Sequence, residues 1–242
     1  MGEARQPQLI IGSDVGRHQR DEASVERIVR GRMHHDLSTV CVTPTLGMID
    51  VRVVESWMQL LTPMNQSFRR IFVRGMEVAD AYNVAIERVL ANPDLSAMKF
   101  VLTLEDDNIP PPRGLLKLYE SIDEYAAVGG LYWGKGDDGW PMIYGRPGGE
   151  PEFAPQPPQP DTVQECNALG MGFTLFRMEL FRDARIERPW FRQLQGNHVD
   201  GEPWLVTQDI YFFQRLRQLG YRVACDTRVR VGHHDVASGV VW

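Results

Sequence analysis

The chain has 242 residues, 43% of them hydrophobic and 24% charged, which is typical of one large globular domain or two small ones. Its net charge of −6 excludes a broad basic surface for nucleic acid or an anionic membrane, although a local basic patch is compatible with it. No apolar run is long enough to span a bilayer, and none follows the N-terminus as in a signal peptide. The three cysteines are far apart and favour a reducing compartment, so we expect a cytoplasmic protein.

Residues 1–38 are polar and irregular apart from the apolar run 9–11, and they predict an N-terminal arm or edge segment. A clear strand follows at 39–43, where Pro44 is expected to stop it, and apolar periodicity then predicts a helix from about 49 to 61. A strand, a loop and a helix in this order typically open a nucleotide-binding α/β unit.

The loop between this strand and this helix has no glycine-rich phosphate fingerprint. Contacts to the base or ribose of a nucleotide would therefore come from the loop itself, through its backbone and its threonines. The candidate donor-binding residues here are Thr43, Pro44 and Thr45.

Strand and helix patterns continue to alternate up to residue 133. The expected strands are 71–73, 100–104 and 126–133, and the expected helices are 78–90 and 115–122. This alternation predicts an α/β fold with a Rossmann-like, mostly parallel central sheet, right-handed crossovers and flanking helices. We expect residues 39–133 to be the nucleotide-binding half of a single domain that spans 39–242.

Residues 134–160 interrupt the alternation, because 13 of these 27 residues are glycine or proline. Such a stretch predicts a long flexible loop, and long loops inside a domain are usually functional or disordered. The apolar residues Trp140, Met142, Ile143 and Tyr144 would suit a mobile lid that closes over a ligand. The alternative is a disordered linker between two domains.

We expect residues 161–242 to form the acceptor-binding and catalytic half, with a small acceptor-side subregion. A strand over 170–176 begins with two glycines, which let a ligand or another backbone approach closely. A helix begins near 207–209, and closing strands are expected at 221–225 and 228–231.

Three acidic residues, Glu105, Asp106 and Asp107, directly follow the strand at 100–104, and the prolines at 110–112 force the chain out of the sheet. Open α/β sheets bind their ligands at the carboxyl ends of strands. Three adjacent carboxylates repel one another, and a cation would offset this repulsion. The pattern predicts a divalent metal holding a phosphate-bearing ligand, but a solvent-facing acidic loop explains these residues equally well.

Two residues near the C-terminus are candidates for the same site. Period-two alternation places Val229, Val231 and His233 on one strand face, so His233 should face the interior at the strand end. Carboxylate, imidazole and phosphate oxygens suit Mn²⁺ or Mg²⁺, with His234 as the alternative ligand. Asp209 lies in the first turn of a helix, where the helix dipole would keep it ionised, as a general base must be. The alternatives without a catalytic role are that His233 is a buried, hydrogen-bonded histidine and that Asp209 is an acid that only caps its helix.

These pieces, in this order, resemble the GT-A class of nucleotide-sugar glycosyltransferases, in particular its family 2-like branch, over about 39–235. The acidic segment 104–111 resembles the D-x-D motif with its trailing prolines, and 170–173 resembles the glycine-containing strand on the acceptor side. Residues 208–221 resemble the E-D helix motif, and 231–233 resemble the C-terminal metal-binding histidine.

The resemblance implies a hexosyltransferase that moves a sugar from a nucleoside-diphosphate sugar to an acceptor hydroxyl. Asp107 and His233 would hold Mn²⁺ or Mg²⁺ on the donor diphosphate, while Glu105 and Asp106 would contact the ribose or the metal's water shell. Asp209 would deprotonate the acceptor. The implied acceptor-binding residues are Gly170, Met171, Gly172 and Gln208.

Three positions depart from the family pattern: Glu105 replaces the usual Asp, Gln208 a frequent Glu, and Tyr82 the Arg of an Ala-Arg-Asn segment. They leave two alternatives, a metal-dependent phosphoester or nucleotide hydrolase and a non-catalytic nucleotide-sugar-binding module. A sugar-nucleotide pyrophosphorylase is disfavoured, because no glycine-rich loop follows the first strand. The donor base and sugar, the acceptor (nucleic acid included), inversion or retention, and the oligomeric state stay open.

Overall fold

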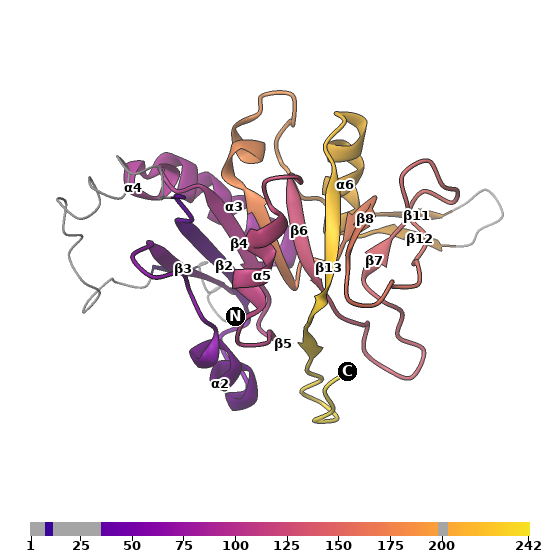
Figure 1. Ribbon diagram of the computed structural model, residues 1–242, viewed down its shortest axis with the longest axis horizontal. Coiled ribbons are helices and arrows are strands. Elements are labelled where there is room, and N and C mark those ends of the chain that lie inside the picture. Colours follow the sequence, from indigo (N-terminus) through magenta and orange to yellow (C-terminus); the bar gives the residue numbers. More distant parts are fainter. Residues whose placement is uncertain (1–7, 12–34, 198–202) are drawn as a thin grey trace, which may run out of the picture.

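The computed structural model describes residues 8–11, 35–197 and 203–242, and it shows a twisted sheet with helices packed against it (Figure 1). The main sheet has eight strands in the order β1-β3-β2-β4-β10-β6-β13-β8. In chain order they are β1 (Gln8–Ile11), β2 (Thr39–Thr45), β3 (Phe68–Arg74), β4 (Phe100–Leu104), β6 (Ala127–Leu131), β8 (Val163–Cys166), β10 (Phe173–Arg177) and β13 (Val223–Arg230). Strands β2, β3, β4, β6 and β13 run in one direction and the other three run against them. The expected α/β class with a mostly parallel sheet is confirmed.

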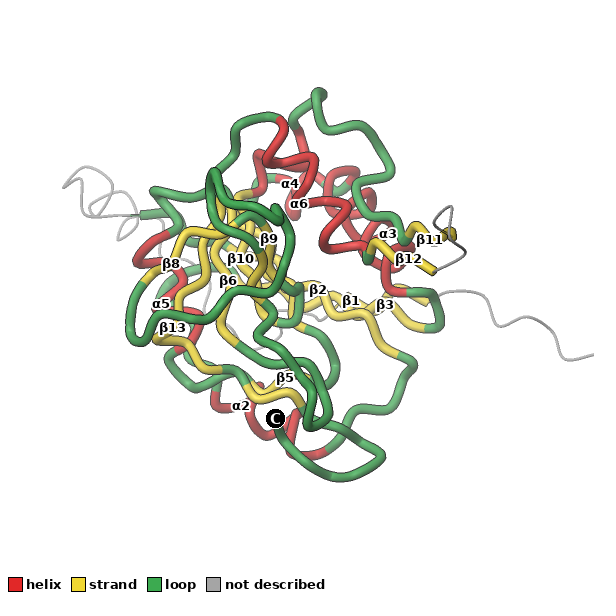
Figure 2. Tube along the Cα trace, turned by 90° about the vertical axis from the view of Figure 1, so that its right-hand side faces the viewer, coloured by secondary structure: helices red, strands yellow, loops and turns green. Residues whose placement is uncertain are grey.

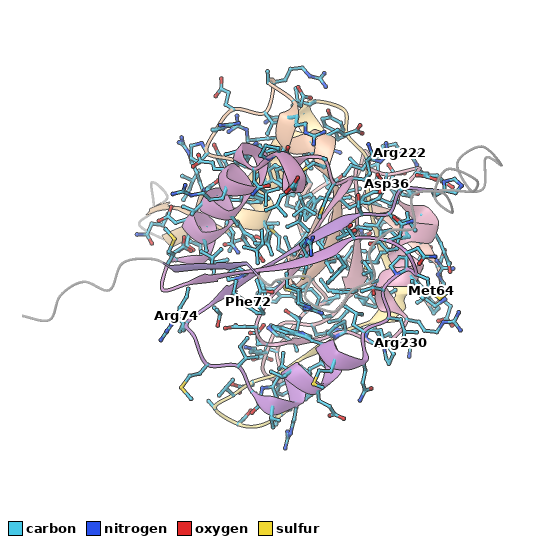
Figure 3. The ribbon with its side chains drawn as sticks, turned by 90° about the vertical axis from the view of Figure 1, so that its left-hand side faces the viewer. Asp36, Met64, Phe72, Arg74, Arg222 and Arg230 are labelled. Carbon is cyan, nitrogen blue, oxygen red and sulfur yellow. The ribbon has the colours of Figure 1, made fainter. Side chains whose placement is uncertain are left out.

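Two layers of helices cover the two faces of the sheet, and each layer has its own apolar core. One core contains side chains of α3 (Val78–Ala91), α4 (Pro93–Ser96), α6 (Gln208–Gln218) and the 3₁₀ helix η1 (Met178–Arg182). The other contains side chains of α2 (Val51–Gln59) and α5 (Gly114–Ser121). On that side Phe72 of β3 packs against Trp57 of α2, with ring centroids 6.3 Å apart (Figure 3).

Strand β2 does not stop at Pro44 as expected, but continues to Thr45. Strand β4 pairs with β2 only over Thr39–Val42, whereas β3 pairs with it along its whole length. Pro44 therefore lies where β4 has already left, so its missing N–H breaks no hydrogen bond on that side.

The last strands also differ from the expectation. The two expected closing strands form one strand, β13, with a register shift between Asp226 and Arg230. The glycine-containing strand begins only at Phe173, and residues 170–172 form the turn between it and β9 (Ala168–Leu169). Strand β10 then inserts between β4 and β6, antiparallel to both.

The glycine- and proline-rich segment 134–160 packs onto the rest of the fold through a short strand, β7 (Ile143–Tyr144), which pairs with β9. Ile143 is fully buried and Phe153 packs against the same core, whereas the side chain of Trp140 is 54% exposed. The segment is therefore anchored in its middle. Closure of its first part over a ligand stays a prediction.

Of the expected N-terminal arm, the apolar run 9–11 belongs to the edge strand β1, which pairs with β3. Residues 1–7 and 12–34 lie outside the described residues. Among those described, no helix is long and apolar enough to cross a bilayer.

A small second layer of strands lies beyond one end of the main sheet. It consists of β5 (Asn108–Ile109) and β14 (Gly232–His233), which pair with each other. Figures 1 and 2 show β5, α2 and the C-terminus together at this end. Another two-stranded ladder, besides that of β7 and β9, is formed by β11 (Leu194–Asn197) and β12 (Pro203–Val206).

The aromatic cluster under α6 predicts a large loss of stability from one substitution. Phe212 is fully buried, and its ring lies 4.7 Å from that of Phe191 and 5.6 Å from that of Phe181. Phe212→Ala should lower the free energy of unfolding by about 3–5 kcal/mol, because it removes buried apolar surface and leaves a cavity. Urea denaturation measures the change. Met58→Ala, on the exposed face of α2, should change it by less than about 0.5 kcal/mol.

Candidate active site

The two-residue ladder between β5 and β14 brings the acidic motif to the C-terminal histidines. His233 pairs with Asn108 and Gly232 with Ile109. Because Asp107 immediately precedes Asn108, its carboxylate lies beside the imidazole of His233, with Oδ2 and Nε2 3.3 Å apart. The backbone N–H of His234 donates to the carbonyl of Asp107 at 2.7 Å. The side chain that meets the carboxylate is therefore that of His233, whereas His234 contributes its backbone.

The orientation of the His233 ring is set by a backbone carbonyl. Nδ1 lies 2.7 Å from the carbonyl oxygen of Trp133. A carbonyl only accepts hydrogen bonds, so Nδ1 carries the hydrogen, and in the neutral ring Nε2 presents its lone pair to Asp107. A lone pair and a carboxylate oxygen facing each other at this distance require a proton or a cation between them. Such a carbonyl contact is typical of a metal-binding histidine.

Asp107 also forms an ion pair with Lys135, whose Nζ lies 2.6 Å from Oδ2. Burial alone would raise the pKa of Asp107, but the hydrogen bonds and charges of His233 and Lys135 outweigh it and lower the pKa below its usual value. The second carboxylate oxygen, Oδ1, is buried and has no hydrogen-bond partner among the described residues. A buried carboxylate oxygen of this kind is incomplete without a further donor or a cation.

These residues fit a divalent cation only in part. In the described ranges, no three or more His, Cys, Asp or Glu side chains converge on one point, so a cation would have two protein ligands, Asp107 and His233. Their facing atoms are separated by about the distance, roughly 3 Å, expected of neighbouring ligands around a small octahedral ion. The remaining ligands would have to be water and phosphate oxygens, as is usual for Mg²⁺ at a phosphate site.

Glu105, the first acid of the motif, is half-buried like Asp107 and hydrogen-bonds to the α3 layer. The hydroxyl of Tyr82, a fully buried residue of α3, donates to Oε1 of Glu105 at 3.1 Å. Glu105 and Tyr82, two of the three residues that depart from the pattern of the family that the sequence resembles, thus contact each other. Burial and the nearby charges of Asp107 and Asp209 raise the pKa of Glu105 to about 8, against the lowering effect of the Tyr82 hydrogen bond. This raised pKa favours the neutral, protonated form of Glu105.

Asp106 turns toward the loop after β2. Burial raises its pKa, while hydrogen bonds from the Thr45 side chain and from the Leu46 backbone act in the opposite direction. The structure therefore brings together Thr45 and Asp106 of the expected donor-binding set. Thr43 and Pro44 are buried within β2. Donor binding by these residues stays a prediction.

Asp209 is 5% exposed in the first turn of α6, as expected from the sequence. Its Oδ1 accepts hydrogen bonds from the Thr207 hydroxyl and, at 2.8 Å, from the backbone N–H of Ile210. The N-terminus of the helix does supply hydrogen-bond donors, which lower the pKa of Asp209. Burial has the larger effect and raises this pKa. That the helix dipole keeps Asp209 ionised stays a prediction. A raised pKa makes the carboxylate a stronger base. Gln208 lies beside it as the first residue of α6.

Gly170 and Gly172 of the expected acceptor strand do allow other groups to come close, but the groups that lie beside them are side chains of the protein itself. The Tyr132 hydroxyl accepts from the backbone N–H of Gly172 at 2.9 Å and also fills the space beside Gly170. A Cβ on Gly172 would lie 2.3 Å from the side-chain oxygen of Asn108. Met171 is buried in the core. Acceptor binding by this segment stays a prediction.

Sequence reasoning missed three residues of the site: Asn108, Trp133 and Lys135. The side chain of Asn108 is fully buried, and the backbone carbonyl of this residue accepts from Nε1 of Trp57 at 3.0 Å. The sequence did contain an indication that Lys135 belongs to the site. It is one of only three lysines, and it follows an expected strand at the same sheet edge as the acids. The contact of Trp133 had no such signal, since it involves only a backbone carbonyl.

No protein-family model and no curated protein sequence matches this chain. Among solved structures it is similar to A197 from STIV, with a TM-score of 0.56 and 19% identity over 82% of this chain and 86% of that one. It is also similar to S. aureus TarS 1-349, with a TM-score of 0.45 and 13% identity over 80% of this chain and 60% of that one. For TarS 1-349 in complex with UDP-GlcNAc the TM-score is 0.44 and the identity 13%, over 80% and 58%.

This chain shares its fold with A197, and the expected GT-A-type fold class is confirmed. At 19% identity the likeness concerns the fold alone. The activity must therefore be argued from the residues of the site.

The raised pKa of Glu105 predicts a pH-dependent stability. Below pH 4.5, the ordinary value, both folded and unfolded states hold this proton; between 4.5 and about 8 only the folded state does. The free energy of unfolding should therefore fall as the pH rises across this window, by about 1 kcal/mol per pH unit from this group, and level off above it. Glu105→Gln should remove this contribution, so its stability relative to the unchanged protein should increase from pH 5 to pH 8.

Urea denaturation at pH 5, 6, 7 and 8 measures this difference. Glu87→Gln, on the exposed side of α3, is the matched surface control. A constant difference between Glu105→Gln and the unchanged protein at all four pH values would show that Glu105 ionises normally in the folded state.

Proposed function

We propose that the protein is a metal-dependent glycosyltransferase, which moves a sugar from a nucleoside-diphosphate sugar to an acceptor hydroxyl. The observation that carries the proposal is the meeting of Asp107 and His233 at the carboxyl end of the sheet, 3.3 Å apart. The orphaned Oδ1 of Asp107 and the fixed tautomer of His233 support a cation there. A bound Mn²⁺ or Mg²⁺ would act as a Lewis acid that neutralises the leaving diphosphate.

The other acidic residues have separate tasks in this proposal. Asp107 and His233 hold the cation, and Asp106 with Thr45 faces the donor nucleotide. In its protonated form, which the raised pKa favours, Glu105 would add no negative charge beside a diphosphate and could donate a hydrogen bond to the ribose. Three ionised carboxylates in this place would repel the donor, so the neutral state of Glu105 favours donor binding.

Asp209 is the proposed base. Its charge contributes to the raised pKa of Glu105, which indicates that it faces the same site. Burial makes its carboxylate more basic, and Thr207 and Ile210 hold one of its oxygens in place. It would take the proton from the acceptor hydroxyl as that oxygen attacks the sugar. The protein needs no covalent intermediate for this reaction.

The metal role of Asp107 predicts loss of donor binding. Asp107→Ala should abolish Mn²⁺-dependent binding of every nucleotide sugar, because one of the two protein ligands is lost. Isothermal titration with UDP-, GDP-, CMP- and dTDP-sugars, with and without Mn²⁺, measures this. Asp123→Ala, an exposed acid after α5, should bind as the unchanged protein does. Unaltered Mn²⁺-dependent binding in Asp107→Ala would remove the metal assignment.

The role of Asp209 predicts a different pattern of loss. Asp209→Asn should reduce turnover by about 10²–10⁴-fold while donor affinity stays nearly constant, since a general base acts in the transition state. Steady-state kinetics and donor titration on the same preparation separate the two effects. An equal loss of both would contradict the role as base. Rapid release of nucleotide without any acceptor would instead indicate the hydrolase alternative.

A further inference from the structure

Residues 133–135, directly after β6, contact both candidate metal ligands. The carbonyl of Trp133 lies 2.7 Å from Nδ1 of His233, and Nζ of Lys135 lies 2.6 Å from Oδ2 of Asp107. One short segment therefore orients the imidazole and supplies a positive charge to the carboxylate. The ammonium contacts the same oxygen that faces Nε2 of His233, so a shared cation would have to compete with it for this oxygen.

The backbone that carries Lys135 is fixed, whereas its ammonium is not. Gly134 donates to the carbonyl of Trp140 at 2.9 Å, and Gly139 donates to that of Gly136 at 2.9 Å. Gly136 has a φ of +93°, and a Cβ on Gly139 would lie 2.1 Å from the carbonyl of Gly134, so this turn requires glycine at both positions. The Lys135 side chain is 34% exposed, so its long stem can move the ammonium without moving the turn.

The charges at the site explain why such a movement would be useful. Three carboxyl groups, those of Glu105, Asp106 and Asp107, lie in succession here, and the ammonium of Lys135 pairs with the last of them. A diphosphate cannot bind well to a negative site. A divalent cation on Asp107 and His233 reverses the sign of the charge and at the same time frees the Lys135 ammonium for a phosphate oxygen.

We infer that Lys135 is an exchangeable counter-cation: it neutralises Asp107 in the donor-free protein, yields this carboxylate to the divalent cation, and then contacts the donor diphosphate. The inference rests on the proposed function, because it assumes the cation site at Asp107 and His233. In it Lys135 both competes with the metal and binds the donor.

Lys135→Met tests the inference through binding rather than turnover. Without any nucleotide, this variant should bind Mn²⁺ about tenfold more tightly than the unchanged protein, because the competing ammonium is gone. With saturating Mn²⁺, it should bind inorganic pyrophosphate about tenfold more weakly, because a phosphate contact is gone. Electron paramagnetic resonance of free Mn²⁺ measures the first affinity, and isothermal titration measures the second.

Two further variants are controls. Lys99→Met removes an exposed lysine elsewhere and should leave both affinities unchanged. Lys135→Arg keeps a cation on the same turn, so it should keep the weak Mn²⁺ affinity of the unchanged protein. A purely structural ion pair would not produce opposite changes in the two affinities.

The outcomes separate this inference from the proposed function. One outcome is that Lys135→Met and the unchanged protein bind Mn²⁺ equally well, while Asp107→Ala does not bind it. The exchange of the Lys135 ammonium for the metal would then be wrong, and the metal site at Asp107 would stand. If neither Lys135→Met nor the unchanged protein binds Mn²⁺, both the exchange and the metal-dependent proposal are wrong.

Discussion

The pairing of β5 with β14 is the constraint on which the site depends. The main sheet brings the acidic motif and the C-terminal segment to the same end, but only this two-residue ladder sets Asp107 beside His233. Further hydrogen bonds hold the ladder: Trp57 donates to the Asn108 carbonyl, and His233 and Trp242 exchange backbone hydrogen bonds at 2.9 and 3.0 Å. A slip of one residue would turn Asp107 away from the imidazole.

Electrostatics then gives the neighbouring acids different states. Glu105 lies half-buried near other carboxylates, and desolvation and their charges raise its pKa, whereas Asp107 has a lysine and a histidine as partners, which lower its pKa. Pairs of carboxyl groups whose pKa values are shifted in opposite directions are typical of sites that need one neutral and one charged group. Here the charged group faces the proposed cation and the neutral group the proposed donor.

The parts of the fold and site that could be predicted from sequence are those that depend on local pattern. The strand before Glu105 and the place of Asp209 in a first helical turn follow from periodicity. His233, expected to face the interior, is only half-buried, and its neighbour His234 is the buried histidine. The contacts of Tyr82 and Lys135 could not be predicted, because one depends on the rotation of α3 against the sheet and the other on the path of a glycine-rich turn. The burial of Asp209, which raises its pKa, could not be predicted either, because it comes from tertiary packing.

The central claim is that a divalent cation joins Asp107 and His233 to the donor diphosphate. The most direct measurement is the melting temperature with UDP-, GDP-, CMP- and dTDP-sugars, each with and without Mn²⁺, because a ligand that binds only the folded state raises it. We expect at least one of the UDP-, GDP- and dTDP-sugars, which carry a diphosphate, to raise the melting temperature only when Mn²⁺ is present. The same increase with and without Mn²⁺, or no increase with any of the four, would contradict this account.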